Sequence, residues 1–397
     1  MMEKQIIYRS MVNPNLKKKR WLVNLVSLIL LLALIYVVFG ASFSKDIFKT
    51  ILGMNYRQFV SIFISILYTI ILAVSLNLST GCLGEMVLGH AGFMAVGAYA
   101  GSLFLKYSGA AADDNIATII AILIGFGSAG MIGFLVGIPV LRLRGDYLAI
   151  ITLGFGQIIS TIIKLLNFDG SGKLTGIPLN RNIMLYAIVV IIIVTIIFTF
   201  MKSRHGRAIL SIREDAIAAE ASGIPVTKYK VGTFTFSAAL AGIAGVLFAQ
   251  NIGVLQPIKF EFNYSIEILV IVVLGGLGSF TGSIVATIVL LLLPEVLRFL
   301  QDYRLIIYST LLIIIMLTKP NGLLGRYEFS AYTAYKKMIR FFKMLPQNIK
   351  NLPQNLKKMA IKFKDFFKHF RPNMKKVFIK MGNNIKTFFR RGGTSDE

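Results

Sequence analysis

The residues of this chain that could take part in chemistry are few, and three of them fall in or beside long apolar stretches. His90, Glu85 and Glu267 are the ionisable groups at these places. A charge at the centre of a bilayer costs roughly 2.5–3.5 kcal/mol on insertion scales, so such groups normally face a partner or water. For His90 the alternatives are a structural hydrogen bond and a role in a solute path. Glu85 lies near a predicted turn, where simple exposure to solvent accounts for its charge.

Cysteine and histidine usage predicts neither a disulfide nor a metal site. Cys82 is the only cysteine, which excludes a disulfide within the chain. His90, His205 and His369 lie far apart in sequence, so a zinc site is not expected. A Ser/His/Asp arrangement or a pair of catalytic carboxylates does not stand out either. The sequence therefore predicts a chain that is not an enzyme and that binds no cofactor or metal of its own.

One segment looks like a phosphate-binding loop without being one. Residues 169–176 read DGSGKLTG, whereas a P-loop needs the pattern G-x-x-x-x-G-K-[ST]. Asn167 stands at the position of the first glycine and Leu174 at the last position of the pattern. Any energy from nucleotide hydrolysis must therefore come from another chain.

The composition is that of a membrane protein. Hydrophobic residues make up 55% of the 397 residues, charged residues make up 15%, and the apolar residues come in long blocks. A soluble domain would intersperse charge to cover its surface, so most of this chain must face lipid. The net charge of +25 gathers in two flanks: residues 1–20 hold six Lys or Arg against one Glu, and residues 326–397 hold eighteen against four acidic residues. Basic flanks of this kind indicate membrane anchoring rather than nucleic-acid binding.

Apolar blocks of about 20 residues, long enough to cross a bilayer as helices, recur through the region 21–325. We expect an all-α membrane protein of about ten spans, with glycines interrupting a span in each half. The first block begins at Trp21, is too long for the apolar region of a signal peptide and is expected to remain as a span. The expected spans are 21–39, 58–79, 84–105, 117–139, 147–167, 183–201, 230–250, 264–277, 280–298 and 304–319.

Basic loops give the expected orientation. If the cluster at 17–20 lies in the cytoplasm, counting the spans places the loop at 142–144, the segment 202–230 and the tail 326–397 on the same side. The loop 105–116 then lies outside and carries little positive excess. Four basic stretches on one side follow the positive-inside rule, so both termini are expected in the cytoplasm.

The longest polar segment between spans, 202–230, has a helical pattern. Small and apolar residues between Ala208 and Glu220 recur at helical spacing, while charged residues occupy another face. Gly223 and Pro225 are expected to end this single helix. A helix of this kind either docks into a groove on a partner or merely connects two spans as a solvated loop, and the pattern alone leaves both open.

Two glycine-rich stretches interrupt the helical pattern, one in each half of the chain, at 88–101 and 273–282. Irregular backbone at membrane depth occurs only where it is buried in protein or lines a wet cavity. Close helix packing through small residues is the alternative. Because a pair of interrupted spans points to a substrate path in transporters with internal repeats, the candidates for a translocation path are Gly89, His90, Gly92, Gly97, Gly275, Gly276 and Gly278.

Several motifs are shared with a known family. The segment 202–230 contains Gly206-Arg207-Ala208, Ile212-Arg213-Glu214, Ala218-Ala219-Glu220-Ala221 and Gly223-Ile224. Leu88-Gly89-His90-Ala91 and Val272–Ser279 carry the likeness into the glycine-rich stretches, with Val87 where the family usually has a serine. Over about 58–325, the chain resembles the permeases of branched-chain amino acid ABC transporters, the LivM/LivH type.

The resemblance implies that the segment 202–230 plugs into an ATPase subunit and passes nucleotide-driven motion to the membrane helices. It implies an importer in the cytoplasmic membrane, built from this chain, a second homologous permease, two ATP-binding cassette subunits and an extracytoplasmic binding protein. ATP would be bound by partner subunits only. The expected contacts with the ATPase are Gly206, Arg207, Ala208, Arg213, Glu214, Ala218, Ala219, Glu220 and Gly223.

Residues 326–397 lie outside the resemblance. Phe and Met at helical spacing, with Lys on the other faces, predict basic amphipathic helices divided by Pro346, Pro353, Pro372 and Gly382. Helices of this kind lie in the membrane interface and attract anionic lipid, so contact with membrane lipids is expected. A disordered cytoplasmic tail and binding of RNA or a partner are the alternatives.

Three other functions remain to be weighed. A permease for urea or short amides shares very similar motifs. An ion-coupled secondary transporter would need acidic residues inside its central spans, which are nearly devoid of them. A purely structural membrane scaffold fits the basic tail but gives no reason for the interrupted spans.

Overall fold

The computed structural model describes residues 56–325, apart from 110, 144, 167, 169–171, 298–302 and 321. The chain divides into two compact units, Met1–Phe329 and Ser330–Glu397. The described residues all belong to the first. The basic N-terminus at 1–20, the expected first span at 21–39 and the tail at 326–397 lie outside the described residues.

The described part of the chain is all-α, as the apolar blocks predict, and its β-structure is limited to an isolated antiparallel bridge between Leu174 and Leu255. The helix α4 runs directly into a π-helical turn, η1. The elements of the first half are α4 (Tyr56–Asn77), η1 (Leu78–Leu83), α5 (His90–Tyr107), α6 (Asn115–Val140) and α7 (Asp146–Leu165).

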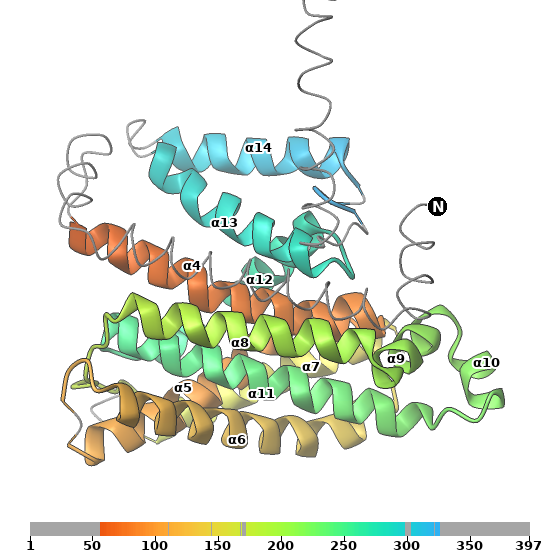
Figure 1. The fold of residues 1–397 in the computed structure, drawn as a ribbon, viewed down its shortest axis with the longest axis horizontal. Helices are drawn as coiled ribbons and strands as arrows, with labels where there is room; N and C mark the ends of the chain where they lie inside the picture. The colour runs from red at the N-terminus through yellow and green to blue at the C-terminus, as the bar shows by residue number, and fades with distance from the viewer. Residues whose placement is uncertain are drawn as a thin grey trace, which may run out of the picture. The chain divides into compact units, whose positions relative to one another are not determined.

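The second half begins with a long helix and two short ones before the next long helix. Its elements are α8 (Ile183–Lys202), α9 (Arg204–Glu214), α10 (Ala216–Ala221), α11 (Val226–Ile252), the 3-10 turn η2 (Pro257–Phe260), α12 (Phe262–Gly275), α13 (Phe280–Val296) and α14 (Arg304–Thr318). Figure 1 shows α4, α6, α8 and α11 running alongside one another, with α9 and α10 beyond one end of them.

Five stretches of helix among the described residues are long and apolar enough to cross a membrane, and a bent pair makes up to six. The bent pair is η2–α12 with α13, whose axes change direction by 119° at the break between them. The five spans are Gln58–Leu83, Asn115–Val140, Asp146–Leu165, Ile183–Lys202 and Val226–Ile252. They confirm the predictions at 58–79, 117–139, 147–167, 183–201 and 230–250.

The remaining predicted spans within the described residues are shorter helices. The start predicted for the span 84–105 is wrong, because α5 begins at His90 and residues 84–89 are not helical. Gly84 is the cause: it caps η1 with a left-handed φ of 84°, which ends the preceding helix. The apolar part of α14 covers Ile306–Thr318.

The core forms around α11, which packs against α4, α5 and α6. Small residues allow these backbones to approach closely. A Cβ added at Gly97 would lie 2.3 Å from Gly242 Cα, and one added at Gly242 would lie 2.2 Å from the carbonyl oxygen of Gly125. Glycines of three helices therefore meet at one point, and a larger side chain there would separate α5, α6 and α11.

Apolar side chains on the outer faces of the helices suit a lipid environment. Large hydrophobic residues are exposed on α6, α7 and α8, among them Leu123, Phe134, Ile150 and Ile192. Lipid tails solvate such side chains, so their exposure costs little in a bilayer.

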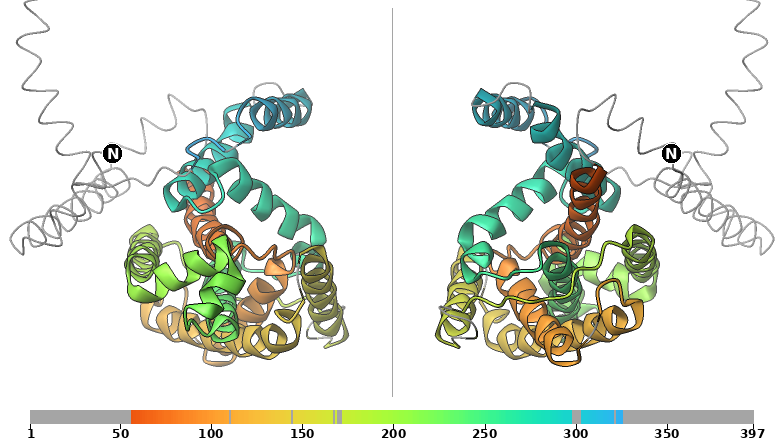
Figure 2. Two further views of the ribbon diagram at one scale, coloured as in Figure 1. Left: turned by 90° about the vertical axis from the view of Figure 1, so that its right-hand side faces the viewer. Right: turned by 90° about the vertical axis from the view of Figure 1, so that its left-hand side faces the viewer.

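Figure 2 views the helices end-on and shows α9 and α10 at the near end in its left panel.

Candidate functional site

The segment 202–230, which we call the coupling segment, folds as two short helices rather than the single helix predicted. Ser203 caps α9, its hydroxyl accepting a hydrogen bond from Gly206 N at 3.4 Å. Asp215 has extended backbone and ends α9. Its carboxylate accepts hydrogen bonds from Ile217 N at 2.9 Å and Ala218 N at 3.0 Å, and so begins α10. The periodic pattern continues across Asp215, which is why it predicted one helix.

The end of the coupling segment follows the prediction. Gly223 has a φ of 81° and lies just after α10, and Pro225 precedes the first residue of α11. Gly223 N donates to the carbonyl oxygen of Glu220 at 2.9 Å, which satisfies a group at the helix end.

The coupling segment has a buried face and an exposed face. Ile209 and Ile212 are buried, whereas Leu210 is 39% exposed and Ile217 72% exposed. Exposed apolar side chains beside charged ones are typical of a docking surface. Among the predicted contact residues, Gly206 and Ala219 are buried, Ala208 and Arg213 are half-buried, and Arg207, Glu214, Ala218, Glu220 and Gly223 are exposed.

The non-helical residues 84–89, which we call the first break, are held by an ion pair. Glu85 pairs with Lys230 at the start of α11. Contrary to the expectation of simple exposure, the Glu85 residue is only 8% exposed. The sequence reasoning failed here because the neutralising partner lies on another helix, 145 residues away. The pair joins the first break to the end of the coupling segment.

Side chains from three other helices satisfy polar groups where α5 begins. Ser75 Oγ lies 2.8 Å from His90 Nε2. Ser265 Oγ accepts from Ala91 N at 3.2 Å, and Thr152 Oγ1 accepts from Leu88 N at 3.1 Å. His90 is buried, and its contact with Ser75 is a structural hydrogen bond. Such a bond was one of the two roles considered for His90 from the sequence, the other being a role in a solute path.

Residues 276–279, which we call the second break, separate α12 from α13 and are held by one buried amide. Gly278 N donates to Asn77 Oδ1 at 2.8 Å. Asn77 Nδ2 donates to the carbonyl oxygen of Ser279 and to Ser283 Oγ, both at 2.9 Å. The sequence analysis did not identify Asn77 as a functional residue. The one signal that could have done so is its position as a lone amide at the end of an apolar span.

The turn η1, which precedes the first break, lies against the second break. A Cβ added at Gly81 of η1 would lie 2.3 Å from Gly278 N, and one added at Gly278 would lie 3.3 Å from the carbonyl oxygen of Gly81. Leu323 N also donates to the carbonyl oxygen of Leu274 at 2.7 Å, which brings the residues after α14 to the same place. The second break is therefore packed between η1 and the residues after α14.

The predicted path glycines lie at close backbone contacts. An added Cβ would be 2.0 Å from Thr152 O at Gly89, 2.8 Å from Gly156 Cα at Gly92, and 2.6 Å from Gly282 C at Gly275. A groove of about 910 Å³ is lined by other residues, chiefly of α6 and α11, including Phe126, Phe134, Val231 and Phe236. In the isolated subunit, these glycines therefore serve the close packing of helices against one another.

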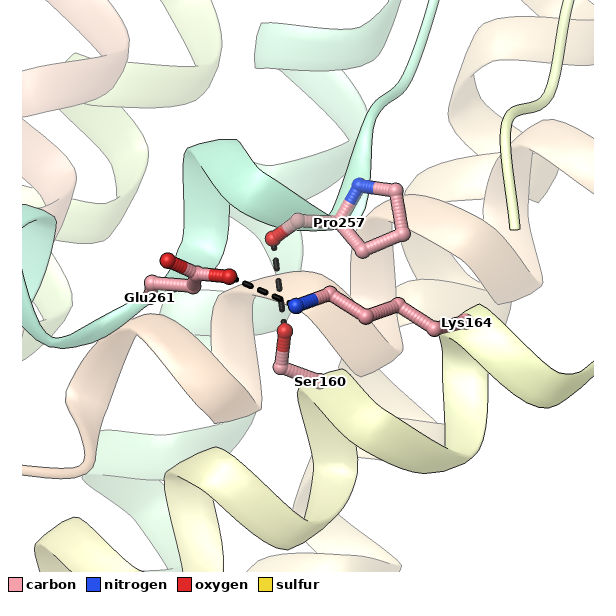
Figure 3. Close-up of polar contacts among 4 residues, drawn as sticks. All are labelled: Ser160, Lys164, Pro257 and Glu261. Carbon is pink, nitrogen blue, oxygen red and sulfur yellow. Dashed lines mark hydrogen bonds and ion pairs between the residues drawn. The ribbon is translucent and has the colours of Figure 1, made fainter. Parts of the chain in front are cut away.

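The opposite end of the helices is joined by an exposed ion pair and a buried hydrogen bond, shown in Figure 3. Lys164 Nζ of α7 lies 2.7 Å from Glu261 Oε1 before α12, with the side chains 45% and 30% exposed. Ser160 Oγ donates to the carbonyl oxygen of Pro257 at 3.4 Å. Within the described residues, His, Cys, Asp and Glu do not gather in groups of three that could hold a metal ion.

The fold and this site define a class: a multi-pass α-helical membrane protein with a polar two-helix segment whose first helix packs against α8, α11 and η1. Residues 58–316 match the family described as the branched-chain amino acid transport system permease component. The chain belongs to this family.

Individual relatives agree with the family match. The high-affinity branched-chain amino acid transport system permease protein LivM of Salmonella typhimurium is 37% identical over 292 residues, which cover 64% of this chain and 67% of that protein. LivM of Escherichia coli K12 is 36% identical with the same coverage. The permease protein LivH of Escherichia coli K12 is 34% identical over 128 residues, covering 32% of this chain and 41% of LivH. No solved structure gives a significant match.

Proposed function

We propose that this chain is a permease subunit of an ABC importer that carries branched-chain amino acids across the cytoplasmic membrane. ATP hydrolysis on partner subunits would drive the transport. The observation that carries the proposal is the family match over 58–316, which includes the coupling segment and both breaks. The names of the similar proteins LivM and LivH supply the substrate class.

The proposed partners are two ATP-binding cassette subunits, a second homologous permease and an extracytoplasmic binding protein. Similarity to both LivM and LivH supports pairing with a second permease. The exposed Leu210 and Ile217, with Arg207, Glu214 and Glu220 beside them, support α9 and α10 as the surface that docks into an ATPase. The buried face of α9 would then pass the motion of the ATPase into the membrane.

The finer topology is part of the proposal. Ten spans, with the basic N-terminus, the coupling segment and the tail 326–397 in the cytoplasm, follow from the basic residues flanking the apolar blocks. We place the substrate path beside the two breaks, bordered by Gly89, His90, Gly92, Gly97, Gly275, Gly276 and Gly278. Broken helices offer backbone groups to a solute once a partner permease completes the lining.

Reconstitution tests the proposal. The chain is co-expressed with its companion permease, ATPase and binding protein, inserted into proteoliposomes, and supplied with labelled leucine outside and ATP inside. We expect uptake that needs ATP, the ATPase and the binding protein. Uptake of urea or a short amide in place of leucine would overturn the substrate class. Uptake driven by an ion gradient without the ATPase would overturn the ABC mechanism.

A further inference from the structure

The side chain of Arg213 lies apart from those of the other charged residues of α9. Arg204, Arg207 and Glu214 are exposed, whereas Arg213 is half-buried. The base of its side chain lies against Gly84, where an added Cβ would be 3.0 Å from Arg213 Cγ. Its guanidinium group lies beside Gly278, where an added Cβ would be 2.8 Å from Arg213 Nη1. One side chain of the coupling segment therefore contacts both breaks.

Two separate reasons require glycine at each of the two positions that Arg213 contacts: the backbone conformation and the space for the arginine. Gly84 and Gly278 have φ values of 84° and 85°, in the left-handed region that other residues rarely adopt. A side chain at either position would also displace the arginine. Each break is thus shaped both to turn the chain and to leave space for Arg213.

Electrostatics favours a cation at this place. Gly84 caps the C-terminal end of α4–η1, and the second break follows the C-terminal end of α12. The carbonyl groups at helix C-terminal ends carry partial negative charge and attract a nearby cation. Arg213 lies at two such ends, although α13 begins just after the second break and its N-terminal end opposes part of this attraction. The delocalised charge of a guanidinium is also easier to desolvate than that of an ammonium group.

The parts that Arg213 contacts are joined to each other. Asn77, at the end of α4, holds the second break by two hydrogen bonds and the following helix α13 by a third, to Ser283. The first break continues from α4 through η1, and Glu85 ties it to Lys230 of α11. A displacement of Arg213 therefore acts on both breaks at once rather than on one of them.

We propose that Arg213 is a positioning residue. Its side chain faces the membrane helices rather than the ATPase and fixes the positions of both breaks relative to α9. This inference rests on the proposed function, since it names the residue through which movement of the coupling segment reaches the proposed path. It assigns to Arg213 a role different from that of Arg207, Glu214 and Glu220, whose side chains remain available to the ATPase.

The test uses the complete complex in proteoliposomes and measures ATP hydrolysis and leucine uptake together. Arg213→Met keeps much of the length of the side chain and removes its charge. We expect assembly and ATP hydrolysis to continue while uptake per ATP falls about tenfold, as for the loss of a cation from two helix ends. Arg213→Lys should restore part of the ratio. The matched control is Arg142→Met, at an exposed arginine outside the coupling segment, which should leave the ratio unchanged.

Hydrogen exchange supplies a second, independent readout on the purified complex. Arg213→Met should speed amide exchange in both 84–89 and 276–279, whereas Arg142→Met should change neither. Should Arg213→Met fail to assemble, Arg213→Lys carries the same two measurements with a smaller expected effect. An unchanged uptake ratio, or faster exchange in one break alone, overturns the role of Arg213. Absence of leucine uptake by the unmodified complex overturns the proposed function instead.

Discussion

The ion pairs at the two ends of the helical body differ in how far water reaches them. At the end that carries the coupling segment, Lys230 and Glu85 pair with side chains 14% and 11% exposed, and the fully buried Asn77 makes two hydrogen bonds to the second break and one to Ser283 of α13. At the opposite end, Lys164 and Glu261 pair with side chains 45% and 30% exposed. That end also holds buried hydrogen bonds, from Asn180 Nδ2 and Gln250 Nε2 to Thr118 Oγ1. The contrast therefore lies between the two ion pairs.

The difference indicates which ion pair holds its helices in place. Removing the partner of a buried polar group costs much stability, so the pair of Lys230 and Glu85 resists separation. Exposed ion pairs contribute little and exchange readily with water. The pair of Lys164 and Glu261 can therefore rearrange at low cost while that of Lys230 and Glu85 stays together. Three substitutions test this contrast, besides those at Arg213.

The largest expected effect is that of Lys230→Met, which breaks the buried ion pair. The carboxylate of Glu85 would lose its partner while still buried, which costs about 3–5 kcal/mol of unfolding free energy. Unfolding of the purified subunit in mixed detergent micelles, followed by circular dichroism, measures the loss. The double variant Glu85→Gln/Lys230→Met removes the charge and should recover part of the stability; losses that merely add would contradict a coupled pair.

Asn77→Leu should have the next largest effect. It leaves Gly278 N–H without its side-chain partner, whereas the carbonyl group of Ser279 still accepts from Ser283 N and Oγ, for a loss of about 1–3 kcal/mol. The same unfolding measurement applies. Asn263→Leu is the matched control, because Asn263 is an exposed residue of α12. Equal stability of the two variants would show that the second break does not depend on Asn77.

Lys164→Met should have the smallest effect and completes the contrast. It makes the same chemical change as Lys230→Met at the exposed pair, and we expect a loss of about 1 kcal/mol or less. The loss should shrink further as salt is added, since solvent-exposed charges are screened. A loss equal to that of Lys230→Met would remove the distinction between the two ion pairs.

Much of the fold could be predicted from the sequence, because a span of a membrane is a local property. About 20 apolar residues suffice to predict a helix, and five predicted spans appear as long apolar helices. Local signals failed where a single side chain changes the backbone. Asp215 ends α9 and begins α10 within a pattern that stays periodic, and Gly84 delays α5 until His90.

The candidate site was predictable only in part, for a different physical reason. Its glycines and the boundaries of the coupling segment follow from residue types. The pairing of Glu85 with Lys230 and the three hydrogen bonds of Asn77 join residues more than 140 positions apart. Such partners become visible only when the helices are assembled, which is why a buried Glu85 looked like a residue of an exposed turn.

The turn η1 gives α4 an adjustable length. A π-helical turn accommodates one more residue than an α-helical turn does, so refolding Leu78–Leu83 as α-helix would release one residue into the loop that follows. The chain beyond it would rotate by about 100° around the helix axis and shift by about 1.5 Å along it. Such a rotation would carry Glu85 away from Lys230 and break their buried pair, so this pair favours the π-helical form of η1.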